Sequence, residues 1–320
     1  MTFLQDILKL HPVRKTETQK NAFRGWAMKQ MRAMGYQPRV ETDGRLKHQN
    51  IVAGEPSRAK VLFIAGYDTP ARSLLPMLVF PRNLPLSFSY FLLNVLLLLL
   101  LPVAVLLVVQ GFWGIPRLSY LAMIVTYLAE LALKMIGPAN PNNANRSTGP
   151  AALLELMSQI PEEDRGKVAF ILFDHSSLER MGSKAWAKTH AETQYTRLTV
   201  CLSDLGVGKD LLLISRSLAR KTDCYPQLEQ ALADPPGRTA HFYKAAGSAV
   251  TSDHGTFHCG SVLTACKAST GIGYYIPALA TVKDTEADPE NISFAAGALA
   301  DFVHRAFGPK TAETEESTCP

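Results

Sequence analysis

The run KVLFIA, residues 60–65, reads as a strand that is buried on both faces, because every residue after Lys60 is apolar. The run VAFILF, residues 168–173, has the same character. Three shorter β-rich runs lie at residues 50–54 (NIVAG), 198–202 and 211–214. Continuous apolar strands are typical of parallel sheets that are covered by helices, so the strands around KVLFIA predict the centre of such a sheet.

Helical patterns alternate with these strands. The apolar positions predict helices over four ranges and a short amphipathic helix at the N-terminus; the four are 16–34, 149–160, 181–189 and 292–307. Alternating strands and helices predict a three-layer α/β/α domain with a mixed, mainly parallel central sheet. We expect residues 1–82 and 137–308 to form this one domain.

An uncharged stretch interrupts the predicted domain, with no Lys, Arg, Asp or Glu from Asn83 to Pro116. Residues 88–109 are apolar enough to cross a bilayer, which takes about 20 helical residues. Residues 118–136 form a weaker second span, because Glu130 and Lys134 lie within it. We therefore expect an inserted two-helix transmembrane hairpin over 83–136, in contact with the lipid bilayer. The alternative, a buried hairpin in a soluble protein, fits such a long uncharged stretch less well.

The charges beside the hairpin predict its orientation. Two spans return the chain to the same side of the membrane, and Arg72, Arg82, Lys134 and Arg146 all lie on that side, whereas the turn carries Arg117 alone. Positively charged flanks stay in the cytoplasm. The sequence thus predicts a multi-pass membrane protein with its globular domain in the cytoplasm.

Composition narrows the function classes. The chain has 320 residues and a net charge of +5, without a basic run interleaved with aromatic residues, so nucleic-acid binding is not expected. Its five cysteines are scattered and form no CxxC pair, which favours reduced thiols and fits a cytoplasmic domain. Residues 309–320 are acidic and polar, and we expect a disordered tail there.

Five segments, in order, resemble the zinc-dependent aminopeptidases of the twenty-eighth metallopeptidase family. They are IAGYDT (64–69), NANRSTGPAALLELM (143–157), FDHSSLERMGS (173–183), SDHGTF (252–257) and GYYIPALATVKDT (273–285). The resemblance covers roughly residues 50–305. A branch of that family carries a membrane hairpin between its first and second motifs, which is where this chain has its uncharged stretch.

The resemblance implies an aminopeptidase-like fold and the places of a two-zinc centre. Family members hold two zinc ions with two histidines, a bridging aspartate, a glutamate and a further aspartate, and a second glutamate acts as the general base. The corresponding positions in this sequence, together with the retained Asp68 that would support the first histidine, are Gly66, Asp68, Asn145, Ser176, Ser177, Asp204 and Ala280.

Most of these positions have lost the required chemistry. Gly66 and Ala280 carry no ligating atom, and the Asn145 amide is a poor bridge between cations. A serine hydroxyl at 176 or 177 is too weakly basic to activate water. We therefore expect no bound zinc, no catalytic residue, and a catalytically inactive pseudopeptidase that binds or regulates a peptide or protein partner.

Two enzymatic alternatives remain. Three further polar residues, His175, Asp253 and His254, are candidate cleft residues, and His175, Asp204 and His254 together could rebuild a metallo-aminopeptidase or other hydrolase site. A serine hydrolase that pairs Ser176 or Ser177 with His254 is less expected, because no GxSxG pattern surrounds either serine.

Overall fold

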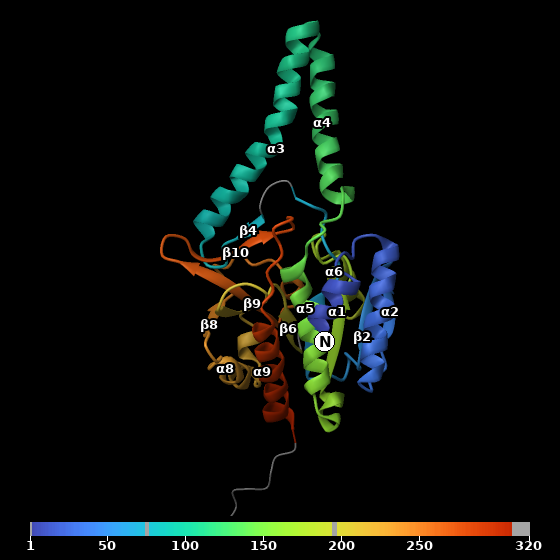
Figure 1. The fold of residues 1–320 in the computed structure, drawn as a ribbon, viewed down its shortest axis with the longest axis vertical. Helices are drawn as coiled ribbons and strands as arrows, with labels where there is room; N and C mark the ends of the chain where they lie inside the picture. Colours follow the sequence, from blue (N-terminus) through green and yellow to red (C-terminus); the bar gives the residue numbers. More distant parts are fainter. Residues whose placement is uncertain (1, 74–76, 194–196, 309–320) are drawn as a thin grey trace, which may run out of the picture.

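A computed structural model of the chain describes residues 2–73, 77–193 and 197–308 (Figure 1). Within these residues one mixed sheet runs in the order β1-β2-β5-β3-β6-β9-β10-β4, and β7 pairs with β8 and β9. Its strands are β1 (Arg39–Asp43), β2 (His48–Ala53), β3 (Val61–Gly66), β4 (Met77–Val79), β5 (Val168–Phe173), β6 (Leu198–Leu202), β7 (Asp210–Ser215), β8 (Thr239–Lys244), β9 (Gly260–Ser269) and β10 (Gly273–Leu279).

The centre of the sheet is parallel. The strand β3 lies between β5 and β6, with Val61 opposite both Val168 and Leu198, and β6 is parallel to β9. The antiparallel pairings lie toward the edges, between β1, β2 and β5 and between β9, β7, β10 and β4. The predicted mixed α/β fold with a mainly parallel centre is confirmed.

The alternation of side chains in β3 places this strand between two apolar cores. Val61, Phe63 and Ala65 belong to one core, while Leu62 and Ile64 belong to the other, and all five are fully buried. The first core packs against the helices α1 (Phe3–Leu10), α2 (Glu17–Ala33), α5 (Ala144–Gln159), α8 (Tyr225–Leu232) and α9 (Pro289–Phe307). The second core is thinner and packs against α6 (Met181–Thr189) and the 3-10 turn η3 (Asp253–Thr256). The α/β body also has two more 3-10 turns, η1 (Glu162–Lys167) and η2 (Ala219–Lys221).

Two long helices, α3 (Leu84–Trp113) and α4 (Pro116–Ile136), pack against each other and project from the α/β body (Figure 1). The Asn83 side chain caps α3 at the Leu86 amide, and Gly114 ends it in the left-handed conformation, just before α4 begins at Pro116. Both helices extend beyond the predicted spans of 88–109 and 118–136.

Among the described helices, α3 alone is long and apolar enough to cross a membrane, which is weak evidence for insertion. Its apolar side chains are exposed, including Phe91, Leu96, Leu100 and Leu107. The second span and the cytoplasmic orientation stay predictions. The predicted tail, residues 309–320, lies outside the described residues.

Candidate functional site

The carboxyl ends of the parallel strands bring the predicted site residues to one edge of the sheet. Gly66 ends β3, while His175 and the two serines follow β5, and Asp204 follows β6. The first turn of α5 adds Asn145, and η3 packs over β3 and β6. Open α/β sheets bind ligands at this edge, so the topology places these residues where a site is expected.

The two serines are held in place by carboxylates. The Ser176 hydroxyl donates to Asp253, and its amide donates to Asp68 Oδ1 at 2.7 Å. Ser177 donates to Asp68 through both its amide and its hydroxyl. Asp68 therefore holds the turn after β5 closed. Both hydroxyl protons are committed to carboxylates, which leaves neither serine arranged as a nucleophile beside a histidine.

Ser176 also fills the space above Gly66. A Cβ placed on Gly66 would overlap the Cβ and Oγ of Ser176, and it would lie 3.4 Å from Arg146 Nη2. The histidine that the resemblance implies at position 66 therefore has no room in this structure.

A guanidinium lies among the carboxylates of this site. Arg146 Nη1 is 3.9 Å from Asp204 Oδ2. Burial alone would lower the pKa of Arg146, but the negative charges of Asp204, Asp68 and Asp253 together raise it above its ordinary value. The positive charge of this region is thus supplied by a side chain of the protein itself.

Burial disfavours the charged form of two further carboxylates of the site, Asp253 and Asp284. Burial raises the pKa of Asp253, although Ser176 and Ser183 both donate hydrogen bonds to it. Burial, together with the charge of Asp204, raises the pKa of Asp284 to about 7. Asp284 Oδ1 accepts the Asn145 amide N–H at 2.8 Å, whereas its Oδ2 has no partner among the described residues.

Asn145 acts as a structural tie between loops. Its side-chain oxygen accepts the Gly206 amide at 2.6 Å, which fixes the loop after β6 against α5. Its side-chain nitrogen is buried and finds no partner in the described part of the chain.

Three site positions have a left-handed backbone, which is uncommon outside glycine. The φ angles are 49° at His175, 53° at Asp204 and 57° at Ala280. Such conformations concentrate at functional sites because the surrounding structure has to enforce them. At Ala280, the carbonyl accepts the Ser73 amide at 2.7 Å. The backbone of the site therefore keeps an unusual shape although its side chains offer few ligands.

A second cluster lies beside the first, and the sequence did not predict it. His48 Nδ1 is 3.0 Å from His175 Nδ1, which is 3.0 Å from Asp174 Oδ2. In the described residues this is the one group of three or more metal-type ligands whose atoms come within 4.8 Å of one another. The buried Lys20 ammonium already lies 2.9 Å from Asp174 Oδ1 and 3.2 Å from His175 Nε2.

This result corrects the rearranged site proposed from the sequence. His175, Asp204 and His254 do not form such a group in the described residues. His175 and His254 line different hollows: His175 shares one of about 160 Å³ with Lys20 and Asp68, while His254 lines one of about 320 Å³. Asp253 is buried and faces Ser176 and Ser183 instead.

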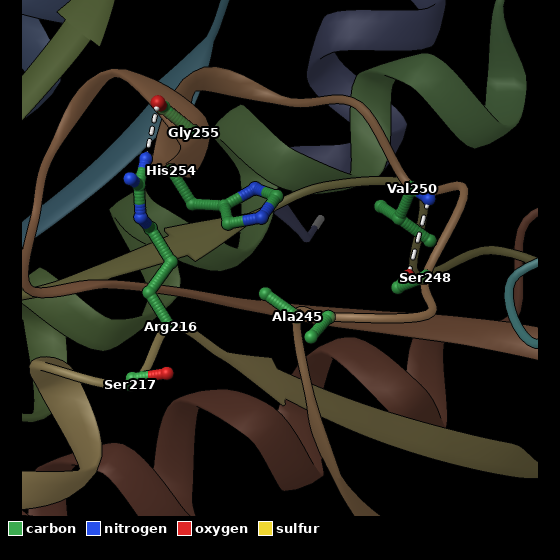
Figure 2. Close-up of a pocket in the computed structure, with 8 residues that line it drawn as sticks. Arg216, Ser217, Ala245, Ser248, Val250, His254 and Gly255 are labelled. Carbon is green, nitrogen blue, oxygen red and sulfur yellow. Dashed lines mark hydrogen bonds between the residues drawn. The ribbon is translucent and has the colours of Figure 1, made fainter.

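His254 points into the larger hollow (Figure 2). Its Nδ1 lies 2.6 Å from Ser252 Oγ. Burial, followed by the charges of Arg180 and Arg216, lowers the pKa of His254 to about 3. The imidazole is therefore neutral at physiological pH.

The donors at the family positions do not fit a pair of zinc ions. Two adjacent dications need several anionic or imidazole ligands. Asp204 is the one carboxylate at the positions of metal ligands, and the Arg146 guanidinium lies beside it. The sequence did not identify four residues as part of the site, which are Arg146, Lys20, His48 and Asp174. The one available signal was the cation directly after Asn145 in the motif NANRSTG.

Comparison with known proteins supports the fold. No family model and no curated relative matches the chain. The fold is similar to that of a glutaminyl cyclase from Porphyromonas gingivalis, with a TM-score of 0.58 and 13% identity over 95% of this chain and 96% of the other. A Zn-dependent exopeptidase from Parabacteroides distasonis matches with a TM-score of 0.56 and 15% identity over 94% and 95% of the two chains. A leucine aminopeptidase precursor from Bacteroides thetaiotaomicron gives 0.57 and 12% over 94% of each chain. These matches confirm the predicted aminopeptidase-like fold, and they concern the fold alone.

Proposed function

We propose that this chain is a membrane-anchored protein with an aminopeptidase-like fold that has no peptidase activity and binds or regulates a peptide or protein partner. The observation that carries the proposal is the place of Arg146. Its guanidinium lies 3.9 Å from Asp204, one of the positions where the resemblance puts a zinc ligand, and the charges of Asp68 and Asp253 also act on it.

The chemistry of the site supports inactivity in two ways. A guanidinium has no vacant orbital with which to coordinate water, so it cannot lower the pKa of a bound water to near 7 as zinc does. The general base is missing as well, because serines stand at 176 and 177 and both donate to carboxylates. The left-handed backbone at His175, Asp204 and Ala280 supports a retained binding edge on the same scaffold.

A second candidate function rests on His48, Asp174 and His175, which together offer two imidazoles and a carboxylate, a ligand set used by catalytic zinc sites. The cluster adjoins the hollow of about 160 Å³. Lys20 argues against it, because a buried ammonium 2.9 Å from Asp174 repels an incoming dication.

The metal content of the purified protein tests both candidates. After incubation with excess zinc and desalting, we expect close to no zinc per chain by mass spectrometry and no hydrolysis of aminoacyl nitroanilides. One zinc per chain that disappears in both His48→Ala and His175→Ala would favour the second candidate. Two zinc ions, or hydrolysis by the wild-type protein that a chelator abolishes, would refute the pseudopeptidase.

We also propose that α3 and α4 together span the bilayer as a hairpin, with the α/β domain on the cytoplasmic side. The exposed apolar side chains of α3 support this, since they would otherwise face water. A cysteine introduced as R117C in the turn should react with a membrane-impermeant maleimide on intact cells, while E162C on the domain should react after lysis alone. Labelling of E162C on intact cells, or extraction of the protein by alkaline carbonate, would contradict this topology.

A further inference from the structure

The hollow of about 320 Å³ is built from three separate segments of the chain. Arg216 and Ser217 follow β7, four residues within 245–250 follow β8, and His254 and Gly255 come from η3. Figure 2 shows the His254 ring and the Arg216 side chain among the residues that line this hollow. The vestigial zinc positions lie elsewhere, so this is a separate candidate site.

Two arginines converge on Gly255. Arg216 Nη1 donates to the Gly255 carbonyl at 2.7 Å (Figure 2). Arg180 Nη1 lies so close to Gly255 that a Cβ at this position would overlap it. The backbone of Arg180 is also left-handed, with a φ of 61°, which directs this arginine from the start of α6 toward η3. The glycine makes room for the second guanidinium.

Neither guanidinium has an anionic partner: no carboxylate of the described residues lies within 4.0 Å of Arg180 or Arg216. The nearby Arg220 differs, because it pairs with Glu229 at 3.5 Å. His254 cannot balance the charge, since it is buried and neutral and its pKa is lowered in part by these same arginines. Arg216 therefore lines the hollow and Arg180 lies beside its Gly255, so two like charges meet there without a counter-charge, which an anionic ligand would relieve.

We propose that this hollow binds a phosphate group, carried by a phospholipid headgroup or by a soluble phosphate compound. A guanidinium group can bind phosphate through two parallel, charge-assisted N–H···O hydrogen bonds. The hydroxyls of Ser217 and Ser248 and the neutral His254 ring line the same hollow and add uncharged polar groups. A volume of about 320 Å³ accommodates a phosphate with part of the molecule that bears it.

The surroundings of the hollow favour the lipid source. Its wall is tied to the segment that leads into α3, because the Ala249 amide donates to the Pro81 carbonyl at 3.2 Å and Arg82 donates to the Gly247 carbonyl at 3.4 Å. If α3 enters the bilayer as proposed above, the wall lies close to the lipid surface. This step rests on the proposed membrane insertion, whereas the phosphate chemistry does not.

Titration with inorganic phosphate tests the chemistry. In isothermal titration calorimetry of the full chain in detergent, against a chloride control of equal ionic strength, we expect saturable binding. R180Q and R216Q should each weaken it about tenfold or more, and R220Q should leave it unchanged. G255A keeps both arginines but displaces Arg180, so it should weaken binding as well. Thermal melts monitored by circular dichroism show whether each variant is folded.

Lipid retention separates the two sources. The wild-type protein and R216Q are placed in nanodiscs of phosphatidylcholine with a minor fraction of phosphatidic acid, and retained lipid is identified by native mass spectrometry. Retention of phosphatidic acid that R216Q loses assigns the site to a lipid headgroup. Phosphate binding without such retention assigns it to a soluble phosphate compound. Absence of both, or an equal loss in R220Q, overturns the proposal.

Discussion

Replacing Arg146 with methionine should lower the free energy of unfolding by about 1–3 kcal/mol at neutral pH, between the values for exposed and for fully buried ion pairs, because Arg146 and Asp204 are partly buried. The guanidinium offsets the charges of Asp68, Asp204 and Asp253. Methionine keeps most of the side-chain volume and removes the charge, so the loss reports electrostatics more than packing. Denaturant titration in detergent, followed by tryptophan fluorescence, measures it.

The matched control is Arg305→Met. Arg305 forms an exposed i,i+4 pair with Asp301 at 2.8 Å, and such pairs contribute less than about 1 kcal/mol. The loss in Arg146→Met should shrink as the pH is lowered, because the unpaired carboxylates can then take up protons. If Arg146→Met costs no more than the control at neutral pH, another cation balances these carboxylates, and the pseudopeptidase proposal loses its main support.

The elements that the sequence predicted most clearly are those whose residues are apolar at nearly every position. The strands β3 and β5 are apolar at nearly every position because they are buried on both faces, and α3 is apolar throughout. The strand β1 went unpredicted because it is an edge strand with the polar sequence RVETD, whose stability comes from pairing with β2. The helix α5 begins at Ala144, five residues before the predicted start, because the pair Gly149-Pro150 resembles a helix beginning while Pro150 here lies inside the helix.

The candidate site shows a similar division. Motif spacing identified positions such as Gly66, Ser176 and Asp204, because short segments keep their register along the chain. It could not predict that Arg146 would lie among carboxylates contributed by three distant segments, since that depends on how the sheet brings strand ends together. The cluster of His48 with His175 was missed for the same reason, because β2 lies outside the motifs.

Replacing Asp284 with asparagine should instead stabilise the protein, by about 2–4 kcal/mol at pH 8. The pKa of Asp284 is raised to about 7 in the folded state, first by burial and then by Asp204. A group with a raised folded-state pKa contributes stability that is fully present below its unfolded pKa and is lost as the pH rises through the folded value. An asparagine cannot ionise, and its side-chain oxygen can still accept the Asn145 amide that Asp284 accepts at 2.8 Å.

The pH dependence distinguishes this electrostatic effect from a change in packing. The difference in unfolding free energy between Asp284→Asn and wild type should grow mainly between pH 4 and pH 7 and be nearly constant above pH 8. The exposed Asp234→Asn serves as the control and should stay within about 0.5 kcal/mol of wild type. A stabilisation that is equal at pH 4 and pH 8 would show that ionisation of Asp284 does not lower the free energy of unfolding. The expected curve, by contrast, would mean that this edge of the sheet holds a carboxylate that destabilises the fold near neutral pH. Binding sites often contain such destabilising charges, because the charge serves to bind a ligand and not to stabilise the fold.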